Sequence, residues 1–351
     1  MITKDRVDVV IPPLDDGAMV LARQRQDQLT KPTNSLGRLE ELSVRLAGMT
    51  GRLDPPLKNK VVFTLAADHG VALEGVSAYP REVTAQMVLN FLAGGAAINV
   101  LARHMEARVV VADFGVDADL PPHPELRSVK VRRGTDSITR GPAMTRAEAT
   151  TAIERGATLV REEVARGLDI ALTGDMGIGN TTAAAALICA RTGLPADEIV
   201  GRGTGVDDAG LERKRAAVRI ALSVNRTRLD DPMDALAAVG GFEIAGLVGI
   251  ILEASANRRP VLVDGFVSGA AALTAAAIAP EVKAYLIAAH QSHELGHAAA
   301  LRKLGLDPLL NLDLRLGEGT GAVLALPLVE AAVRILNEMA TFAEAGVSNR
   351  E

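Results

Sequence analysis

The chain has 351 residues, enough for one large α/β domain with a small appendage. Hydrophobic residues make up 48% of it but aromatic residues only 2%, so the core must be built from aliphatic side chains. The net charge of −5 is spread over interspersed acidic and basic residues, with no basic run. With few aromatic side chains to stack on bases, this composition argues against nucleic acid as a partner.

The single cysteine, Cys189, lies in an apolar run and is expected to be a core residue. One cysteine excludes a disulfide within the chain and favours a cytoplasmic location. Residues 1–16 lack the apolar stretch of a signal peptide. The uncharged run between Asp264 and Glu281 is too short and too rich in glycine and alanine to span a bilayer. We therefore expect a soluble protein of the cytoplasm with no membrane segment.

Both ends of the chain are predicted to be helical. In the first fifty-odd residues leucines recur at roughly helical spacing, until the paired prolines of 53–60 end the pattern. After Pro327 the sequence is again amphipathic with the period of a helix. We expect the two helical ends to pack together, so that residues 1–56 with 328–351 form a small helical domain and residues 57–327 form the large α/β domain.

Six apolar runs alternate with helical stretches between the two ends. They are 61–68, 107–115, 168–175, 259–266, 282–290 and 309–317. Such alternation is typical of βαβ units and predicts a mainly parallel sheet. Each run ends in polar or glycine residues, which either serve the turn or face a ligand, because ligands bind outside the carboxyl ends of such strands. Six such ends together favour the ligand.

A first glycine-rich loop, Gly174–Thr182, follows one of these runs and precedes an alanine-rich helix. Glycines let backbone N–H groups approach an anion, and the helix N-terminus adds favourable dipole charge. The spacing does not match the P-loop, which needs a Gly-Lys-Ser/Thr ending. A tight strand-to-helix turn is the alternative explanation.

A second glycine cluster, Gly201–Gly205, is followed by Lys214. Two glycine loops with Arg202 and a lysine indicate a ligand with one phosphate and a ribose. The alternative for Lys214 is a solvated lysine on a helix surface.

A third cluster places Glu318 between Gly317 and Gly319, where a carboxylate can face a ligand with little steric screening. The alternative is a turn glutamate that faces solvent.

His293 and His297 stand four apart and could share one helical face as zinc ligands, but no third ligand accompanies them, so no metal is expected.

Taken in order, these segments resemble the nicotinate-nucleotide–dimethylbenzimidazole phosphoribosyltransferase family along nearly the whole chain. The matching segments are 31–40, 67–71, 94–100, 113–117, 141–145, 174–182, 201–208, 240–246, 263–266 and 317–322. The resemblance implies a Rossmann-like α/β domain with flanking helices, a small helical domain from both termini, and a homodimer. It also implies transfer of phosphoribose from nicotinate mononucleotide to 5,6-dimethylbenzimidazole, without a cofactor, in assembly of the cobalamin nucleotide loop.

The same resemblance implies site residues. Glu318 would be the general base, and the glycine loops with Lys214 would hold the phosphate and ribose, while Tyr79, Gln86 and Leu316 would line the acceptor pocket. The substrate-binding set is Asp175, Gly177, Ile178, Gly179, Asn180, Thr181, Gly203, Thr204, Gly205, Lys214, Leu316, Gly317, Tyr79 and Gln86. Two segments depart from the family pattern: Asp175 stands where some members have glutamate, and 290–297 differs at several positions.

The expected phosphoribosyl transfer requires only one catalytic carboxylate. The donor's pyridinium leaves as a neutral ring and needs no general acid, unlike a glycosidase leaving group. The attacking imidazole must lose its other N–H proton, and one general base suffices for that. Asp175 is expected to add negative charge near the sugar. Two alternatives remain: a nicotinamide-dependent oxidoreductase and a non-catalytic nucleotide- or base-binding protein. The first βα unit lacks the GxGxxG motif of nicotinamide-dependent enzymes, which argues against the oxidoreductase.

Overall fold

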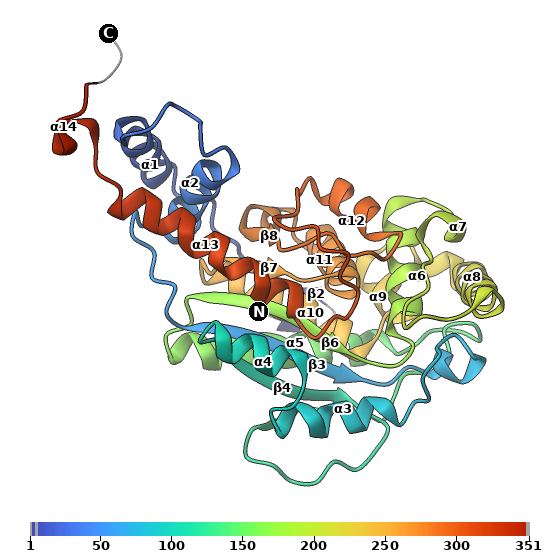
Figure 1. Ribbon diagram of the computed structural model, residues 1–351. Helices are drawn as coiled ribbons and strands as arrows, with labels where there is room; N and C mark the ends of the chain where they lie inside the picture. Colours follow the sequence, from blue (N-terminus) through green and yellow to red (C-terminus); the bar gives the residue numbers. More distant parts are fainter. Residues whose placement is uncertain (1, 4–5, 349–351) are drawn as a thin grey trace.

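A six-stranded sheet, parallel throughout, forms the centre of the computed structural model, which describes residues 2, 3 and 6–348 (Figure 1). The strands are β3 (Lys60–Ala67), β4 (Arg108–Gly115), β5 (Leu126–Ser128), β6 (Ile170–Met176), β7 (Val261–Val263) and β8 (Leu286–Ala288). Their order is β5-β4-β3-β6-β7-β8. This is the 3-2-1-4-5-6 order of the doubly wound Rossmann fold, in which ligands bind where the order reverses, here between β3 and β6.

Helices account for most of the remaining chain. They are α1 (Asp16–Gln28), α2 (Arg38–Thr50), α3 (Val83–Leu92), α4 (Ala97–His104), α5 (Arg146–Ala165), α6 (Asn180–Thr192), α7 (Ala196–Ile199), α8 (Asp208–Val224), α9 (Pro232–Val239), α10 (Phe242–Ala256), α11 (Phe266–Ile278), α12 (His297–Leu304), α13 (Thr320–Glu338) and α14 (Phe342–Ala345). Three 3₁₀ turns lie at Gly70–Glu74, Arg226–Arg228 and Pro280–Tyr285. A short hairpin, β1 (Ile2–Thr3) with β2 (Arg6–Val7), precedes the first helix.

The predicted α/β class is confirmed, but one predicted strand is wrong. Residues 309–317 form no strand; they contribute one isolated bridge, between His290 and Leu310, and Leu312 and Leu316 are exposed. Alternating leucines imitate a strand there although the segment runs over the surface. The sixth strand is instead β5, whose three residues are too few to show a period.

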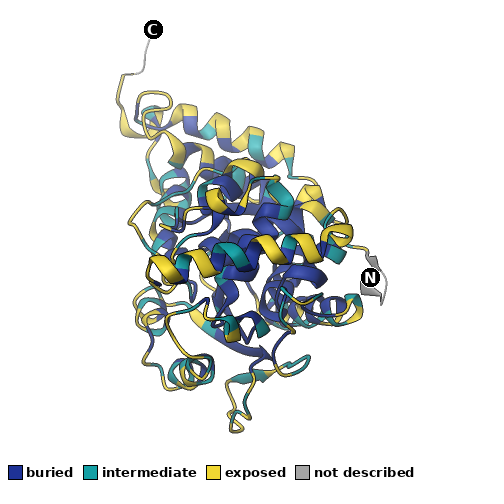
Figure 2. Ribbon diagram, turned by 90° about the vertical axis from the view of Figure 1, so that its right-hand side faces the viewer, coloured by how far each residue is buried: buried dark blue, intermediate teal, exposed yellow. Residues whose placement is uncertain are grey.

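The core is aliphatic, as the composition predicts, and it fills the centre of the molecule beneath the exposed outer helices (Figure 2). Helix α10 packs on β3, β4 and β6 with α5 outside it, whereas α4 packs on β4 and α13 on β6 and β7. Right-handed crossovers from a sheet of this order put helices on both of its faces. Cys189 is buried in this core, and burial raises the pKa of its thiol to about 12, so it is no nucleophile at neutral pH.

Helices α5 and α10 approach so closely that glycines are required between them. A Cβ on Gly249 would lie 2.0 Å from the carbonyl oxygen of Ile153, and one on Gly156 would lie 2.1 Å from that of Gly246. We expect Gly249→Ala to lower the free energy of unfolding by about 1–3 kcal/mol, because one backbone must move away from the other. Urea unfolding followed by circular dichroism measures this change.

Gly17→Ala, in α1, is the matched control. The added methyl there would meet only the end of the Asp15 side chain, at 3.2 Å. Equal midpoints for Gly249→Ala and Gly17→Ala would contradict the close packing of α5 and α10.

The two ends of the chain meet, as expected. Helices α1, α2 and α13 lie side by side and contact one another (Figure 1). Arg25 of α1 donates to the carbonyl oxygen of Leu336 in α13 at 2.6 Å. However, α13 begins at Thr320 rather than after Pro327, which lies inside the helix. Burial of its apolar side against β6, β7 and α2 outweighs the missing hydrogen bond of a helical proline, about 3 kcal/mol. The division into residues 1–56 with 328–351 and 57–327 remains a prediction.

Among the residues that the structure describes, two segments are long and apolar enough to cross a membrane, Val83–His104 and Thr320–Glu338. The first consists of α3 and α4, which are separated by a turn at Gly94 and Gly95. The second is α13, whose apolar side is part of the core. A core helix of a soluble protein meets the same length and hydropathy criterion, and α13 packs as such a core helix.

Candidate active site

A cavity of about 500 Å³ lies beyond the carboxyl ends of β6, β7 and β8. Ten residues of the predicted set line it: Tyr79, Asp175, Gly177, Ile178, Asn180, Thr181, Gly203, Thr204, Leu316 and Gly317. They come from separate parts of the chain, which include both glycine loops and the turn before α13. The topology therefore brings the three glycine clusters to one place.

The other predicted residues lie around this cavity or away from it. Gly179 is the N-cap of α6, behind the lining residues, and Gly205 closes the second loop, near Arg315. Lys214 reaches the cavity wall from α8, as described below. Gln86 is exposed on α3 and does not line the cavity, so an acceptor role for it would require a separate subsite on the α3 side.

Lys214 is a buried cation at one end of the cavity. Its Nζ donates to Oγ1 of Thr181 at 3.0 Å, and a Cβ on Gly203 would lie 2.5 Å from the same Nζ. Glycine is thus needed at position 203 both for this approach and for its φ of +53°. Burial lowers the pKa of Lys214 to about 8, against the opposing effect of the Glu294 carboxylate. The solvated-lysine alternative is therefore wrong.

Two charged residues at this end of the cavity were not predicted from the sequence. Arg315 lines the cavity, and its Nη1 donates to the carbonyl oxygen of Gly203 at 3.0 Å. Glu294, also a lining residue, accepts from the N–H of Gly203 at 2.8 Å. The two side chains hold the second glycine loop from both sides. Arg315 lies in the segment 309–317, which was wrongly predicted to be a strand. In the sequence, only their neighbours could have pointed to these two residues: Glu294 lies beside His293, and Arg315 lies two residues before Gly317.

The N-terminus of α6 forms part of the same wall. Helix α6 begins at Asn180, directly after Gly179, and Gly179 supplies no side chain to cap it. The N–H of Ile178 donates to Thr84 Oγ1, which fixes the loop to α3. The N–H groups of Asn180 and Thr182 already donate to the carbonyl oxygens of Gly177 and Gly179, so it is the helix dipole and the ammonium of Lys214 that make this end of the cavity suitable for a phosphate group.

Glu318 lies in a turn of three residues with positive φ, +84° for Gly317, +63° for Glu318 and +97° for Gly319. Its side chain is buried, which rules out the solvent-facing alternative, and its Oε2 accepts from the N–H of Ile98 at the start of α4 at 3.2 Å. Gly317 lines the cavity, while the Glu318 carboxylate lies behind it on the α4 side. Burial raises the pKa of Glu318, against the lowering effect of the Ile98 N–H.

Asp175 belongs to a group of buried carboxylates beneath the cavity. Burial and the nearby carboxylates of Asp264, Glu243 and Glu318 raise its pKa well above the usual value, although Asn180 donates to it at 2.9 Å. These surroundings favour the protonated form of Asp175. A cationic ligand would favour the charged form, which is the form that the expected role near the sugar requires.

The histidines do not form a zinc site. Helix α12 begins at His297, so His293 lies outside it and is exposed, whereas His297 is fully buried. Burial, with a contribution from His290, lowers the pKa of His297 to about 3. His69 instead forms a buried pair with Glu243 at 2.7 Å, beneath the first glycine loop. Within residues 2, 3 and 6–348, no three histidine, cysteine or carboxylate residues lie close enough together to hold a metal ion.

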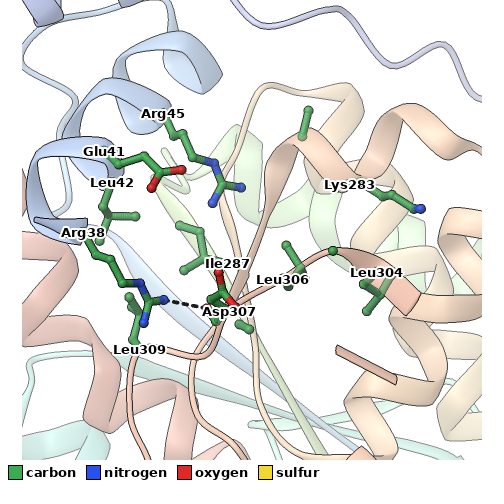
Figure 3. Close-up of a pocket in the computed structure, with 13 residues that line it drawn as sticks. Arg38, Glu41, Leu42, Arg45, Lys283, Ile287, Leu304, Leu306, Asp307 and Leu309 are labelled. Atoms are coloured by element: carbon green, nitrogen blue, oxygen red, sulfur yellow. Dashed lines mark hydrogen bonds between the residues drawn. The ribbon is translucent and has the colours of Figure 1, made fainter. Parts of the chain in front are cut away.

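A second cavity, of about 380 Å³, lies between α2 and the β8 edge of the sheet (Figure 3). Arg38 and Arg45 extend from α2 toward it, but Arg38 donates to the carbonyl oxygens of Asp307 and Pro308, and Arg45 to that of Leu286. These arginines tie the N-terminal helices to β8 and to the segment after α12. None of the predicted site residues lines this cavity, so it is not the candidate active site.

Comparisons with known proteins agree with these features. A family model described as Phosphoribosyltransferase matches residues 11–347. The nicotinate-nucleotide–dimethylbenzimidazole phosphoribosyltransferase of Chloroflexus aggregans is 59% identical over 341 residues, and that of Chloroflexus aurantiacus is 58% identical over 340 residues; each match covers 97% of both chains. The crystal structure of CobT from Thermus thermophilus is similar with a TM-score of 0.92 at 53% identity, covering 95% of this chain and 100% of that one.

Proposed function

Because this chain belongs to the nicotinate-nucleotide–dimethylbenzimidazole phosphoribosyltransferase family, we propose that it transfers phosphoribose from nicotinate mononucleotide to 5,6-dimethylbenzimidazole. The products are α-ribazole 5′-phosphate and nicotinate, in assembly of the cobalamin nucleotide loop. Membership of a phosphoribosyltransferase family removes the support for an oxidoreductase.

One observation carries this proposal: an anion-binding end and a buried carboxylate lie on either side of the same glycine turn. Arg315 and the α6 N-terminus line one side of the cavity, and the buried Lys214 contacts Thr181 of the same wall, which suits the phosphate and ribose of the donor. Glu318 lies behind Gly317, toward α4, which suits an acceptor ring that approaches from the other side. A sugar carbon between them would meet the incoming ring and the leaving ring on opposite faces.

The residues divide the chemistry accordingly. When the bond from the pyridinium nitrogen to the anomeric carbon breaks, the nitrogen keeps the electron pair and nicotinate departs with a neutral ring, so this step needs no acid. One imidazole nitrogen of the acceptor forms the new bond, and the proton on its other nitrogen passes to the Glu318 carboxylate. A general base of this kind contributes about 10²–10⁴-fold to the rate. Positioning by the glycine loops and charge stabilisation by the Asp175 carboxylate supply further acceleration.

Incubating the protein with both proposed substrates tests the activity directly. We expect equal amounts of nicotinate and of the riboside phosphate, separated by chromatography. Nicotinate release without the second product would indicate hydrolysis, and binding without release of nicotinate would indicate a base- or nucleotide-binding protein. Parallel reactions with adenine and phenol would define the range of acceptors.

Donor binding should depend on pH through Lys214. A bound phosphate stabilises the ammonium form and so raises its pKa above the value of about 8 that burial gives it. Above pH 8 binding must therefore take up a proton, and affinity falls as pH rises. We expect donor affinity to be about tenfold weaker at pH 9 than at pH 7, since one pKa unit corresponds to a factor of ten.

Calorimetry at the two pH values measures this change, and Lys214→Arg is the matched variant. Its guanidinium stays charged at both values. A wild-type affinity equal at pH 7 and pH 9 would show that Lys214 does not contact the phosphate.

We also propose a homodimer in the cytoplasm. Leu89 of α3 and Val100 of α4 leave apolar surface exposed, 43% and 53% of each residue. Tyr79 and Leu316 add to it beside the cavity, where a second copy would shield the acceptor ring from water. Light scattering of the purified protein tests the dimer. The single buried cysteine supports a reducing compartment.

A further inference from the structure

The turn that carries Glu318 is anchored by a residue that the proposed reaction does not use, Asp264. Asp264 directly follows β7 and is 1% exposed. One carboxylate oxygen, Oδ1, accepts from the N–H of Ala322 at 2.9 Å, and the other, Oδ2, accepts from the N–H of Gly319 at 3.3 Å. Both donors belong to the start of α13, the helix that follows Glu318.

These two bonds replace a cap that α13 lacks. Its N-cap residue is Gly319, which has no side chain to accept from the third helical N–H. Asp264 accepts that N–H, from Ala322, and also the N–H of the N-cap residue itself. In a capping box the side chains of the N-cap residue and of the third helical residue each accept one of these two N–H groups. Here the carboxylate of Asp264, which follows β7, accepts both.

The turn needs such an anchor because it is strained. Glu318 is a residue with a side chain in the left-handed region, at a φ of +63°, a conformation that is unfavourable for any residue but glycine. Each adjoining strand contributes one bond. Thr64 of β3 donates to the carbonyl oxygen of Glu318 at 3.0 Å, and the carbonyl oxygen of Asp175 in β6 accepts from the N–H of Glu318 at 3.2 Å. Asp264 supplies the anchor from β7, and it alone brings a charge.

We propose that Asp264 is a positioning residue for Glu318, which holds the base's turn through Gly319 and Ala322 and places a fixed negative charge beside the base. The inference rests on the proposed transferase function. The titratable side chains that face this point are Glu318, Asp175 of β6 and His290 after β8, whose Nε2 lies 3.6 Å from Oδ1 of Asp264.

The charge gives the proposal a signature that a purely structural residue would lack. Asp264 is among the groups that raise the pKa of Glu318. A general base works when it is deprotonated, so activity falls as pH falls through its pKa. Removing the charge of Asp264 lowers that pKa, and the acid limb of the pH profile of kcat must then move to lower pH.

Asp264→Asn is the first variant, because asparagine keeps the size but loses the charge and one of the two acceptors. We expect kcat to fall about tenfold or more, the KM for the donor to stay within about twofold, and the acid limb to move to lower pH. Asp264→Glu keeps the charge, so its acid limb should stay near that of the wild type while kcat falls. Asp16→Asn, an exposed aspartate of α1, is the matched control.

A double-mutant cycle with Glu318→Gln shows whether Asp264 acts through the base. If it does, Asp264→Asn lowers the residual activity of Glu318→Gln by less than about threefold, because the two effects are not additive. Multiplicative effects, or an Asp264→Asn enzyme with an unmoved acid limb, would overturn the proposal. If Asp264→Asn does not fold, as judged by thermal unfolding, a shifted limb in Asp264→Glu would overturn it instead. A wild-type protein without transfer activity would overturn the proposed function and not this inference alone.

Discussion

Glu318→Gln is expected to lower kcat by about 10²-fold or more, which corresponds to at least about 2.7 kcal/mol of transition-state stabilisation. Glutamine keeps the size of the side chain and an oxygen that can accept from the N–H of Ile98, but it cannot take the proton of the acceptor ring. Donor affinity should change by less than about twofold, because the phosphate contacts lie on the other side of Gly317. Single-turnover kinetics and donor calorimetry measure the two quantities separately.

The pH profile gives a second readout for the same variant. Burial raises the pKa of Glu318, so the acid limb of the wild-type enzyme should lie above the usual pKa of glutamate and should be absent in Glu318→Gln. The control is Glu338→Gln, at the exposed far end of the same helix, where the glutamate pairs with Arg334. Near-normal turnover of Glu318→Gln would remove this residue from the role of base.

Lys214→Ala should weaken donor binding about 10- to 100-fold, because a hydrogen bond to a charged group is worth about 1.5–3 kcal/mol. The effect should fall on the donor's Kd and KM, while kcat at saturating donor changes much less, since the lysine contacts a group that does not react. Alanine also leaves a space at a residue that is 1% exposed, so unfolding must be measured in parallel.

A donor without its phosphate isolates the contact. Nicotinate riboside should bind to the wild type and to Lys214→Ala with equal affinity, because neither complex contains the ammonium–phosphate pair. Lys303→Ala, at an exposed position of α12, is the control for loss of a lysine charge. If the variant and the wild type bind nicotinate mononucleotide equally, the phosphate lies elsewhere.

Local patterns were enough to predict most strands of the sheet and to single out the expected base. Apolar runs between polar ends predicted β3, β4, β6, β7 and β8, because a strand buried on both faces must be apolar along its length. Glu318 stood out because it lies between Gly317 and Gly319, a pattern that predicts a carboxylate on a tight turn. These features depend on neighbouring residues alone, so the sequence displays them directly.

Other features of the sequence misled because the same pattern has two explanations. The leucines of 309–317 alternate as in a strand, yet the segment lies on the surface and offers Arg315 to the cavity. The segment 31–40, one of the family's matching segments, lies outside the cavity. Lys31 and Glu40 form a buried ion pair at 2.8 Å, and Glu40 also accepts from the N–H of Leu36 at the entry to α2.

By itself, then, the sequence determined the fold class, the aliphatic core, the three glycine clusters and the identity of the expected base. Only the tertiary structure decided which side chains meet: Glu294 and Arg315 at the second glycine loop, Asp264 beneath the Glu318 turn, and Lys214 buried against Thr181. The physical reason is that the patterns of helices and strands depend on residues close together in the chain, whereas these contacts join segments far apart in the chain that become neighbours only through the order of the parallel strands.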